Sequence, residues 1–152
     1  MRITSPAFAA NGILPTAFTC DGAGVNPPLT FADVPQAARS LALIVDDPDV
    51  PKQLRSDGLF VHWTLWNINP LVSDIEKDSV PQGAVEGVTT RGVPGFVGAC
   101  PPDREHRYFF KLYALDAQLV LPVTAGKDDL ERAMAGHILA AATLMVRYDR
   151  PR

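Results

Sequence analysis

The sequence predicts an α+β protein that is mainly β, with antiparallel sheets, an α-helix near the C-terminus and few other short helices. Three observations predict this fold: three apolar strand patterns before residue 116, one helical pattern after it, and turn residues throughout. Fourteen prolines and eleven glycines are spread over 152 residues, which favours many turns and short strands over a helical bundle. Strands that come first, followed by a late helix, favour an antiparallel sheet.

The strand patterns lie at 40–46, 59–68 and 106–115. The first contains five consecutive apolar residues, and the third is apolar on both faces, so we expect both to be central strands covered on two sides. Successive residues of a strand point to opposite faces, so the sequence predicts which residues share a face. In the second segment it predicts one face made of Phe60, His62, Thr64, Trp66 and Ile68, and in the third a face made of His106, Tyr108, Phe110, Leu112 and Ala114.

Apolar residues at helical spacing predict one helix over 130–145, with His137 on its apolar stripe in a structural role. Gly126 is an acceptable N-cap, and two carboxylates follow it in the first turn, where they suit the helix dipole. Short strands are expected at 18–20 and 119–123. The segment 71–95 is expected to be a long surface excursion.

Size and charge exclude several classes of function. The length fits a single domain, 1–152. A net charge of −3 argues against general nucleic-acid binding, and the lack of an 18-residue apolar run argues against integral membrane association. The N-terminal residues lack the apolar segment of a secretory signal, so we expect a cytoplasmic protein. Its two cysteines, Cys20 and Cys100, are then expected to be reduced thiols, with no disulfide needed for the fold.

Polar residues mark the ends of the three predicted strands. Asp47 and Asp49 follow the first, His62 lies within the second, and His106 begins the third. A buried imidazole needs a hydrogen-bond partner, and a carboxylate at a neighbouring strand end is a natural one. Each feature also has a structural interpretation: a turn at Asp-Pro-Asp, a histidine satisfied within the core, and a plain loop at 98–102. The sequence has no P-loop, no Cys-x-x-Cys pair and no nucleophile elbow, although a Ser-His-Asp triad stays open.

Taken together, these stretches resemble the phosphatidylethanolamine-binding protein family, also called Raf kinase inhibitor proteins. The stretches that carry the resemblance are Asp47-Pro48-Asp49-Val50-Pro51, Phe60-Val61-His62-Trp63 and 98–108, which includes Pro101-Pro102 and His106-Arg107-Tyr108. The bacterial and archaeal branch is indicated by Thr19-Cys20-Asp21-Gly22, Pro27-Pro28-Leu29, Tyr113-Ala114-Leu115-Asp116 and Ala133-Met134-Ala135-Gly136-His137. The resemblance extends over nearly the whole chain, from about Ile3 to Tyr148.

The resemblance implies a β-sandwich of antiparallel sheets with a shallow anion-binding pocket at one end of the strands. Carried over by motif, the pocket residues are Asp47, Asp49, Pro51, Phe60, His62, Gly98, Cys100, His106 and Tyr108. No cofactor is implied. The implied partners are phosphate-bearing small molecules or head groups, a protein kinase or protease, and a second copy of the chain. Apolar residues in the excursion (Val72, Val80, Val85 and Val88) also favour a homodimer.

The residue types favour binding over catalysis. Backbone N–H groups of the glycine loop, the Tyr108 hydroxyl and a protonated His106 can all donate to an anion. Asp47 and Asp49 are expected to hold the histidines, or to accept a proton from a singly protonated phosphate. Because no nucleophile or leaving-group path is evident, we predict a binding protein and not an enzyme. Two alternatives stay open: a metal-dependent hydrolase that uses Asp47, Asp49, His62 and His106, and a protease inhibitor that acts through 71–95.

Overall fold

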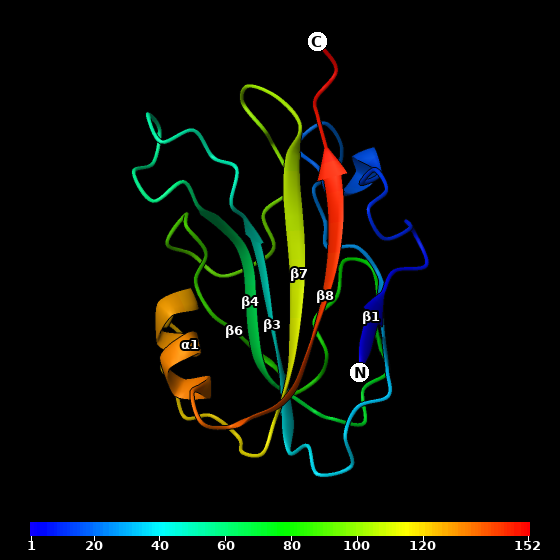
Figure 1. Ribbon diagram of the computed structural model, residues 1–152, viewed down its shortest axis with the longest axis vertical. Helices are drawn as coiled ribbons and strands as arrows, with labels where there is room; N and C mark the ends of the chain where they lie inside the picture. Colours follow the sequence, from blue (N-terminus) through cyan, green and yellow to red (C-terminus); the bar gives the residue numbers. More distant parts are fainter.

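Two antiparallel β-sheets make up most of the computed structural model, which describes residues 1–152 (Figure 1). The smaller sheet has the strand order β1-β2-β5, formed by β1 (Arg2–Thr4), β2 (Leu29–Ala32) and β5 (Asp74–Ile75). The larger sheet has the order β6-β4-β3-β7-β8, formed by β6 (Val85–Glu86), β4 (Phe60–Ile68), β3 (Ser40–Asp47), β7 (His106–Leu115) and β8 (Ile138–Tyr148). The chain also forms a short 3-10 helix, η1 (Thr16–Phe18), and one α-helix, α1 (Lys127–Met134). This is the mainly β, two-sheet fold that the sequence predicted.

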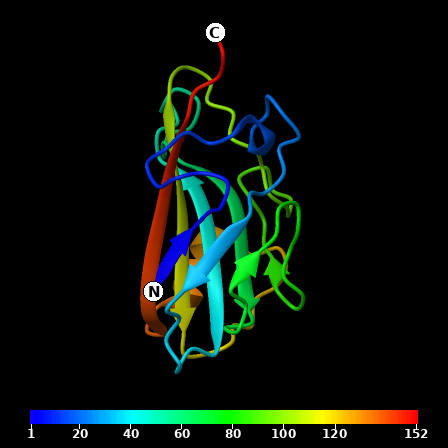
Figure 2. The ribbon, with the colours of Figure 1, turned by 90° about the vertical axis from the view of Figure 1, so that its right-hand side faces the viewer.

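The main core lies between the two sheets. It contains 22 buried residues, and both sheets contribute to it: Ile3, Leu29 and Phe31 from the smaller one, and Leu41 and Leu43 from the larger one. Figure 2 shows the smaller sheet on the near side of the larger one. Each fully buried aliphatic or aromatic side chain stabilises the fold by about 1.5–3 kcal/mol relative to its exposed state. This sandwich therefore holds the strand ends, and the loops attached to them, in fixed positions.

A second, smaller core lies on the other face of the larger sheet, where α1 packs (Figure 1). Leu130 and Met134 of α1 contact a cluster that includes Ile44 and Trp66. The helix begins after Gly126, as predicted, and the Gly126 N–H donates to the side chain of Asp129 at 3.3 Å. Strands β3 and β7 are both central in the larger sheet, as predicted. Every residue of β3 is buried, which confirms that this strand is covered on both faces, whereas β7 is fully covered on one face only, so that part of its prediction was wrong.

The residues of β7 divide between its two faces as predicted, but only one of these faces is fully buried. His106, Tyr108, Phe110, Leu112 and Ala114 are all buried, and the intervening Arg107, Phe109, Lys111 and Tyr113 are exposed or half-buried.

Two β-bulges in β4 break the alternation that was predicted there. Val45 pairs with Trp63 and Asp46 pairs with Val61, so His62 is an extra residue with no partner in β3. A second bulge lies between Leu65 and Ile68, where Asn67 adopts a left-handed conformation with φ 54°. As a result Ile68 packs with Trp63 in the core between the sheets and not with Trp66, so the predicted face was wrong. Bulges re-aim side chains, and the first one sets the direction of His62.

The prediction of a helix over 130–145 was wrong beyond Met134. Gly136, with φ 81°, ends the helix, and residues from Ile138 onward form β8, which pairs with β7 along its length. His137 therefore lies in an exposed turn, where its Nδ1 is 2.7 Å from the Asp116 carboxylate, and not on an apolar helix stripe.

Two smaller predictions also need correction, and the surface excursion predicted at 71–95 contains short strands. At 18–20, Phe18 ends η1 and Thr19 forms a single bridge with Ala99, instead of a strand. Residues 119–123 are irregular. The segment 71–95 contains β5 and β6, and buried Asn26 holds it down by accepting from the Ser79 N–H and donating to the Glu76 carbonyl.

The apolar residues of that segment mostly pack on the chain's own cores. Val72 contacts the main core and Val85 the smaller one, whereas Val80 is exposed. They therefore give little reason to expect a homodimer, which stays a prediction based on the family resemblance.

The expectation of reduced thiols was wrong, because Cys20 and Cys100 form a disulfide with a Cα–Cα distance of 5.4 Å. The fold brings residues that are 80 positions apart into contact, which nothing in their spacing indicates. Disulfides are typical of oxidising compartments, so a cytoplasmic location stays a prediction. No helix in the structure is long and apolar enough to span a membrane.

Candidate functional site

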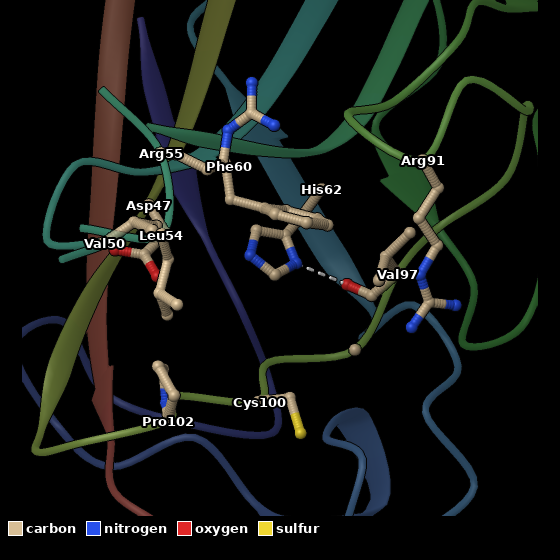
Figure 3. A pocket seen from close by; sticks show the side chains of 11 residues that line it. Asp47, Val50, Leu54, Arg55, Phe60, His62, Arg91, Val97, Cys100 and Pro102 are labelled. Carbon is tan, nitrogen blue, oxygen red and sulfur yellow. Dashed lines mark hydrogen bonds between the residues drawn. The ribbon is translucent and has the colours of Figure 1, made fainter. Parts of the chain in front are cut away.

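A pocket of about 290 Å³ opens where β3 ends and its two antiparallel neighbours, β4 and β7, begin (Figure 3). Its walls come from these strand ends and from three loops. The residues that line it are Asp47, Val50, Leu54, Arg55, Phe60, His62, Arg91, Val97, Gly98, Cys100 and Pro102. The strand ends therefore converge as the sequence analysis expected.

Five of the nine predicted site residues line this pocket: Asp47, Phe60, His62, Gly98 and Cys100. The other four do not form its wall. Pro51 belongs to the loop that carries Val50 and Leu54. Asp49, His106 and Tyr108 support the lining residues from outside the wall.

His62 is a neutral hydrogen-bond acceptor in this pocket. Its Nδ1 lies 2.7 Å from the Val97 carbonyl oxygen, and because a carbonyl only accepts, Nδ1 must carry the proton. Burial lowers the pKa of His62 to about 4, so the ring is neutral at physiological pH and Nε2 has a free lone pair. Nε2 has no partner within the protein, and Figure 3 shows this nitrogen turned towards the pocket.

A second hydrogen bond, between backbone atoms, also joins His62 and Val97. The Val97 N–H donates to the His62 carbonyl at 2.9 Å, so the two residues share two hydrogen bonds. The ring also packs against Phe60 (centroid distance 4.6 Å) and, edge to face, against Tyr108 (5.3 Å). The position and the tautomer of the imidazole are therefore fixed from several sides.

His106 is fully buried between two carboxylates. Its Nδ1 lies 2.7 Å from Asp47 Oδ2, and its Nε2 lies 2.7 Å from Asp103 Oδ1. We predicted that one ring nitrogen of His106 would donate to an anion, and this is wrong for the structure as it stands, because both nitrogens have carboxylate partners. Burial raises the pKa of Asp47, although the hydrogen bond from His106 opposes this effect. His106 therefore holds the Asp47 side chain that lines the pocket.

Asp49 does not hold a histidine, contrary to the prediction. It forms a two-pronged ion pair with Arg107, with distances of 2.9 Å to Nε and 2.8 Å to the terminal nitrogen, and it also accepts from the Arg107 backbone N–H. These bonds, above all those of the side chain, lower the pKa of Asp49. The pair fastens the loop after β3 to the start of β7, which fixes one wall of the pocket.

Tyr108 has a buried hydroxyl with no hydrogen-bond partner. Burial is the main cause of a strong rise in its pKa, so the hydroxyl stays protonated. Buried polar atoms in native structures nearly always have partners, and an exception next to a pocket indicates a functional group. Tyr108 is thus a hydrogen-bond donor directly behind the His62 ring.

The Gly98 loop is held tightly against the N-terminal part of the chain. A Cβ at position 98 would lie 3.0 Å from the Thr19 carbonyl carbon and 3.1 Å from the Gly24 Cα. The Cys20 N–H donates to the Ala99 carbonyl at 3.0 Å, and the disulfide joins the two segments covalently. Glycine is needed at 98 because of this close approach.

Two cations of the pocket, Arg55 and Arg91, were missed by the sequence analysis. Arg55 donates from Nε to the Leu59 carbonyl at 2.9 Å. The Arg91 backbone N–H donates to the Thr89 hydroxyl at 3.2 Å, but its guanidinium, which belongs to the pocket lining, has no hydrogen bond or ion pair within the protein. Both lie in irregular loops, so no periodic pattern marked them. A threonine before Arg91 offers a weak signal: the Thr90 hydroxyl accepts from the Val61 N–H at 2.7 Å, which fixes this loop beside β4.

The four side chains proposed as metal ligands do not converge on a common point. No group of three or more His, Cys, Asp or Glu side chains in the chain is arranged to hold a metal ion. Asp49 binds Arg107, and both nitrogens of His106 face carboxylates, so these residues present no free ligand atoms of the kind that the hydrolase alternative requires.

Comparison with known proteins decides the family. The family model described as "Phosphatidylethanolamine-binding protein" matches residues 4–149. The chain belongs to this family. A UPF0098 protein of Chlamydia pneumoniae is 49% identical, with 99% of both chains covered, and one of Methanothermobacter thermautotrophicus is 42% identical, again with 99% of both covered.

Two solved structures from bacteria share the fold of this family member. The crystal structure of a putative phosphatidylethanolamine-binding protein homolog from Chlamydia trachomatis is 45% identical, with a TM-score of 0.96 over 99% of this chain and 97% of that one. Escherichia coli YbcL is 29% identical, with a TM-score of 0.89 over 99% of this chain and 98% of that one. The resemblance to the bacterial and archaeal branch is therefore confirmed, as is the fold.

Proposed function

We propose that this protein binds phosphate groups in the pocket and, through a phosphate-bearing small molecule, head group or partner protein, regulates kinases or other signalling proteins. One observation carries the proposal: the pocket combines two arginines with a neutral histidine acceptor and has a donor hydroxyl without a partner next to it. Guanidinium groups recognise phosphate through charge-assisted hydrogen bonds. The family membership of the chain supports a ligand of this class.

The chemistry of the pocket favours a phosphate that still carries one proton. A phosphate O–H can donate to His62 Nε2, whereas the remaining oxygens can accept from Arg55 and Arg91. The Asp47 carboxylate lines the same pocket and repels a fully ionised phosphate. A singly charged phosphate, or a phosphodiester with a donor group beside it, fits these constraints better than a dianion.

The test is a titration of the purified protein with inorganic phosphate and with phosphoethanolamine, followed by amide chemical shifts of the pocket loop. We expect shifts at Gly98 and Val97, and a loss of binding in Arg91→Met and His62→Phe. Arg39→Met is the matched control, because Arg39 is an exposed arginine at the opposite end of β3 with no ion pair. No shift at Gly98 up to millimolar ligand, or equal weakening by the control, contradicts the proposal.

A phosphoserine peptide compared with its unphosphorylated form extends the test to protein partners. Binding of the phosphorylated form alone, lost in Arg91→Met, supports regulation through a phosphorylated protein. The protease-inhibitor alternative gains no specific support, because β5, β6 and Asn26 hold much of the segment 71–95 against the body of the protein.

A further inference from the structure

We propose that the Cys20–Cys100 disulfide is a redox switch for the pocket: when a dithiol reductant opens it, the loop that carries Val97, Gly98 and Cys100 loosens and ligand affinity falls. The ligand part of this inference rests on the proposed function. The effect on the loop itself does not, and it can be measured without any ligand.

The disulfide is open to solvent, unlike the residues around it. Cys20 and Cys100 are both exposed, whereas their neighbours Thr19 and Ala99 have exposed fractions of 0% and 2%. A disulfide that only staples a core is normally shielded, but thiol–disulfide exchange requires direct access of a thiolate to a sulfur atom. Exposed disulfides exchange more readily than buried ones, and both cysteine residues of this one are exposed.

The same bond is part of the pocket wall. Cys100 lines the pocket, and Figure 3 shows its side chain at the lower edge, on the loop that continues to Val97. This loop belongs to neither sheet. Apart from the disulfide, two backbone hydrogen bonds join it to the N-terminal segment: 3.0 Å from Cys20 N to Ala99 O, and 3.4 Å from Ala99 N to Phe18 O. The second is long for a hydrogen bond, so the covalent link is the strongest restraint on this side.

Loosening of the loop reaches the ligand-binding atoms through Val97. The Val97 carbonyl fixes the proton of His62 on Nδ1 and thereby leaves Nε2 as an acceptor. When the loop moves, His62 loses this partner, and the pocket loses both its fixed tautomer and the wall at Gly98. If the binding-competent arrangement falls to about a tenth of the population, the apparent affinity falls about tenfold.

The exchange step is ordinary dithiol chemistry. A thiolate of the reductant attacks one sulfur of the disulfide, the S–S bond breaks, and the other cysteine leaves as a thiolate that takes up a proton. The second thiol of the reductant then closes a ring disulfide and releases the remaining cysteine. The protein disulfide is reduced to two thiols, and the dithiol is oxidised to a cyclic disulfide.

The experiment compares oxidised protein, protein reduced with dithiothreitol, and the variant Cys20→Ser/Cys100→Ser, with thiol titration to confirm each state. Hydrogen exchange reports on the Cys20 and Ala99 amides, and calorimetry with inorganic phosphate reports on affinity. We expect faster exchange at these two amides, unchanged exchange in β3 and β7, and about tenfold weaker phosphate binding in the reduced protein and in the double variant. Reoxidation should restore the wild type and leave the variant unchanged.

Each other outcome is decisive. Equal exchange at Cys20 and Ala99 in the two redox states overturns the switch, and so does global unfolding on reduction, because the bond is then a structural staple. If oxidised protein fails to bind phosphate, the proposed function falls, and the exchange data alone decide the effect on the loop. Leu130→Ala serves as the control: it destabilises the α1 side of the sheet, away from the pocket, and should leave phosphate affinity unchanged.

Discussion

Replacement of His106 by alanine should strongly destabilise the protein, chiefly because it leaves a buried carboxylate without its partner. His106 is fully buried, and each ring nitrogen lies 2.7 Å from a carboxylate oxygen. The Asp47 side chain, which is 4% exposed, would lose its partner and stay buried as a charge. Removal of one partner of a buried ion pair costs about 3–5 kcal/mol, which is a large part of a typical domain stability of about 5–15 kcal/mol.

Two further variants separate the buried charge from the lost packing. Asp103 is 41% exposed, so Asp103→Asn should cost under about 1 kcal/mol. Asp47→Asn in the His106→Ala background removes the stranded charge and should recover about 1–3 kcal/mol. Burial raises the pKa of Asp47 even with His106 in place, and this agrees with a charge that needs its partner.

Urea denaturation at pH 7, followed by tryptophan fluorescence and circular dichroism, measures these differences. The m-values should stay equal, so that midpoints report stability alone. A cost below about 1 kcal/mol for His106→Ala would refute the reasoning. So would a failure of Asp47→Asn to recover any stability, since the penalty would then come from the cavity and not from the charge.

Four other predictions concern acid stability, ligand protonation, packing and assembly. Arg107 lowers the pKa of Asp49 in the folded state. The ion pair therefore stabilises the fold at pH values above the pKa of Asp49 in the unfolded chain, and this stabilisation is lost as the pH falls through the lowered, folded-state pKa. Asp49→Asn should accordingly flatten the pH dependence of the free energy of unfolding on the acid side. Phosphate affinity should decline as pH rises through about 6 to 7, where the ligand loses its second proton, with no inflection from His62; calorimetry in which affinity rises with pH would count against this. Gly87→Ala would place a Cβ on the Trp66 ring and should lower stability by about 1–3 kcal/mol, measured by thermal unfolding. From the family resemblance we still predict a homodimer, and sedimentation that finds only monomer at micromolar concentration would exclude it.

The apolar segments of the sequence predicted the central part of the fold well. Segments 40–46 and 106–115 are rich in apolar residues at strand spacing, and they form the central strands β3 and β7. The last strand was missed because its residues fit both periods: Ile138, Ala141 and Leu144 follow a helix, and Ala142, Leu144, Val146 and Tyr148 follow a strand. Pairing with β7 decides between them, and a local pattern contains no information about that partner.

Strand patterns predicted the candidate site only where the residues lie in or beside strands, and the loop residues Gly98 and Cys100 were predicted through the family resemblance. Asp47 and His62 belong to strands, so their meeting at one sheet edge follows from antiparallel pairing. Arg55 and Arg91 lie in loops whose course depends on single contacts such as that of Thr90, and no period marks them. The disulfide depends on the docking of two irregular segments that are far apart in the chain, which local sequence does not encode.

Because His62 and Val97 are joined by two hydrogen bonds, the shape of the pocket wall at Val97 is independent of the position of the proton on His62. Both bonds use only backbone atoms of Val97, yet the Val97 side chain lines the pocket. The residue type at position 97 can therefore change the shape and polarity of the wall while the proton stays on the same nitrogen of His62. A substitution at position 97, whether designed or natural, can therefore change which ligands fit the pocket and still leave His62 Nε2 as the acceptor.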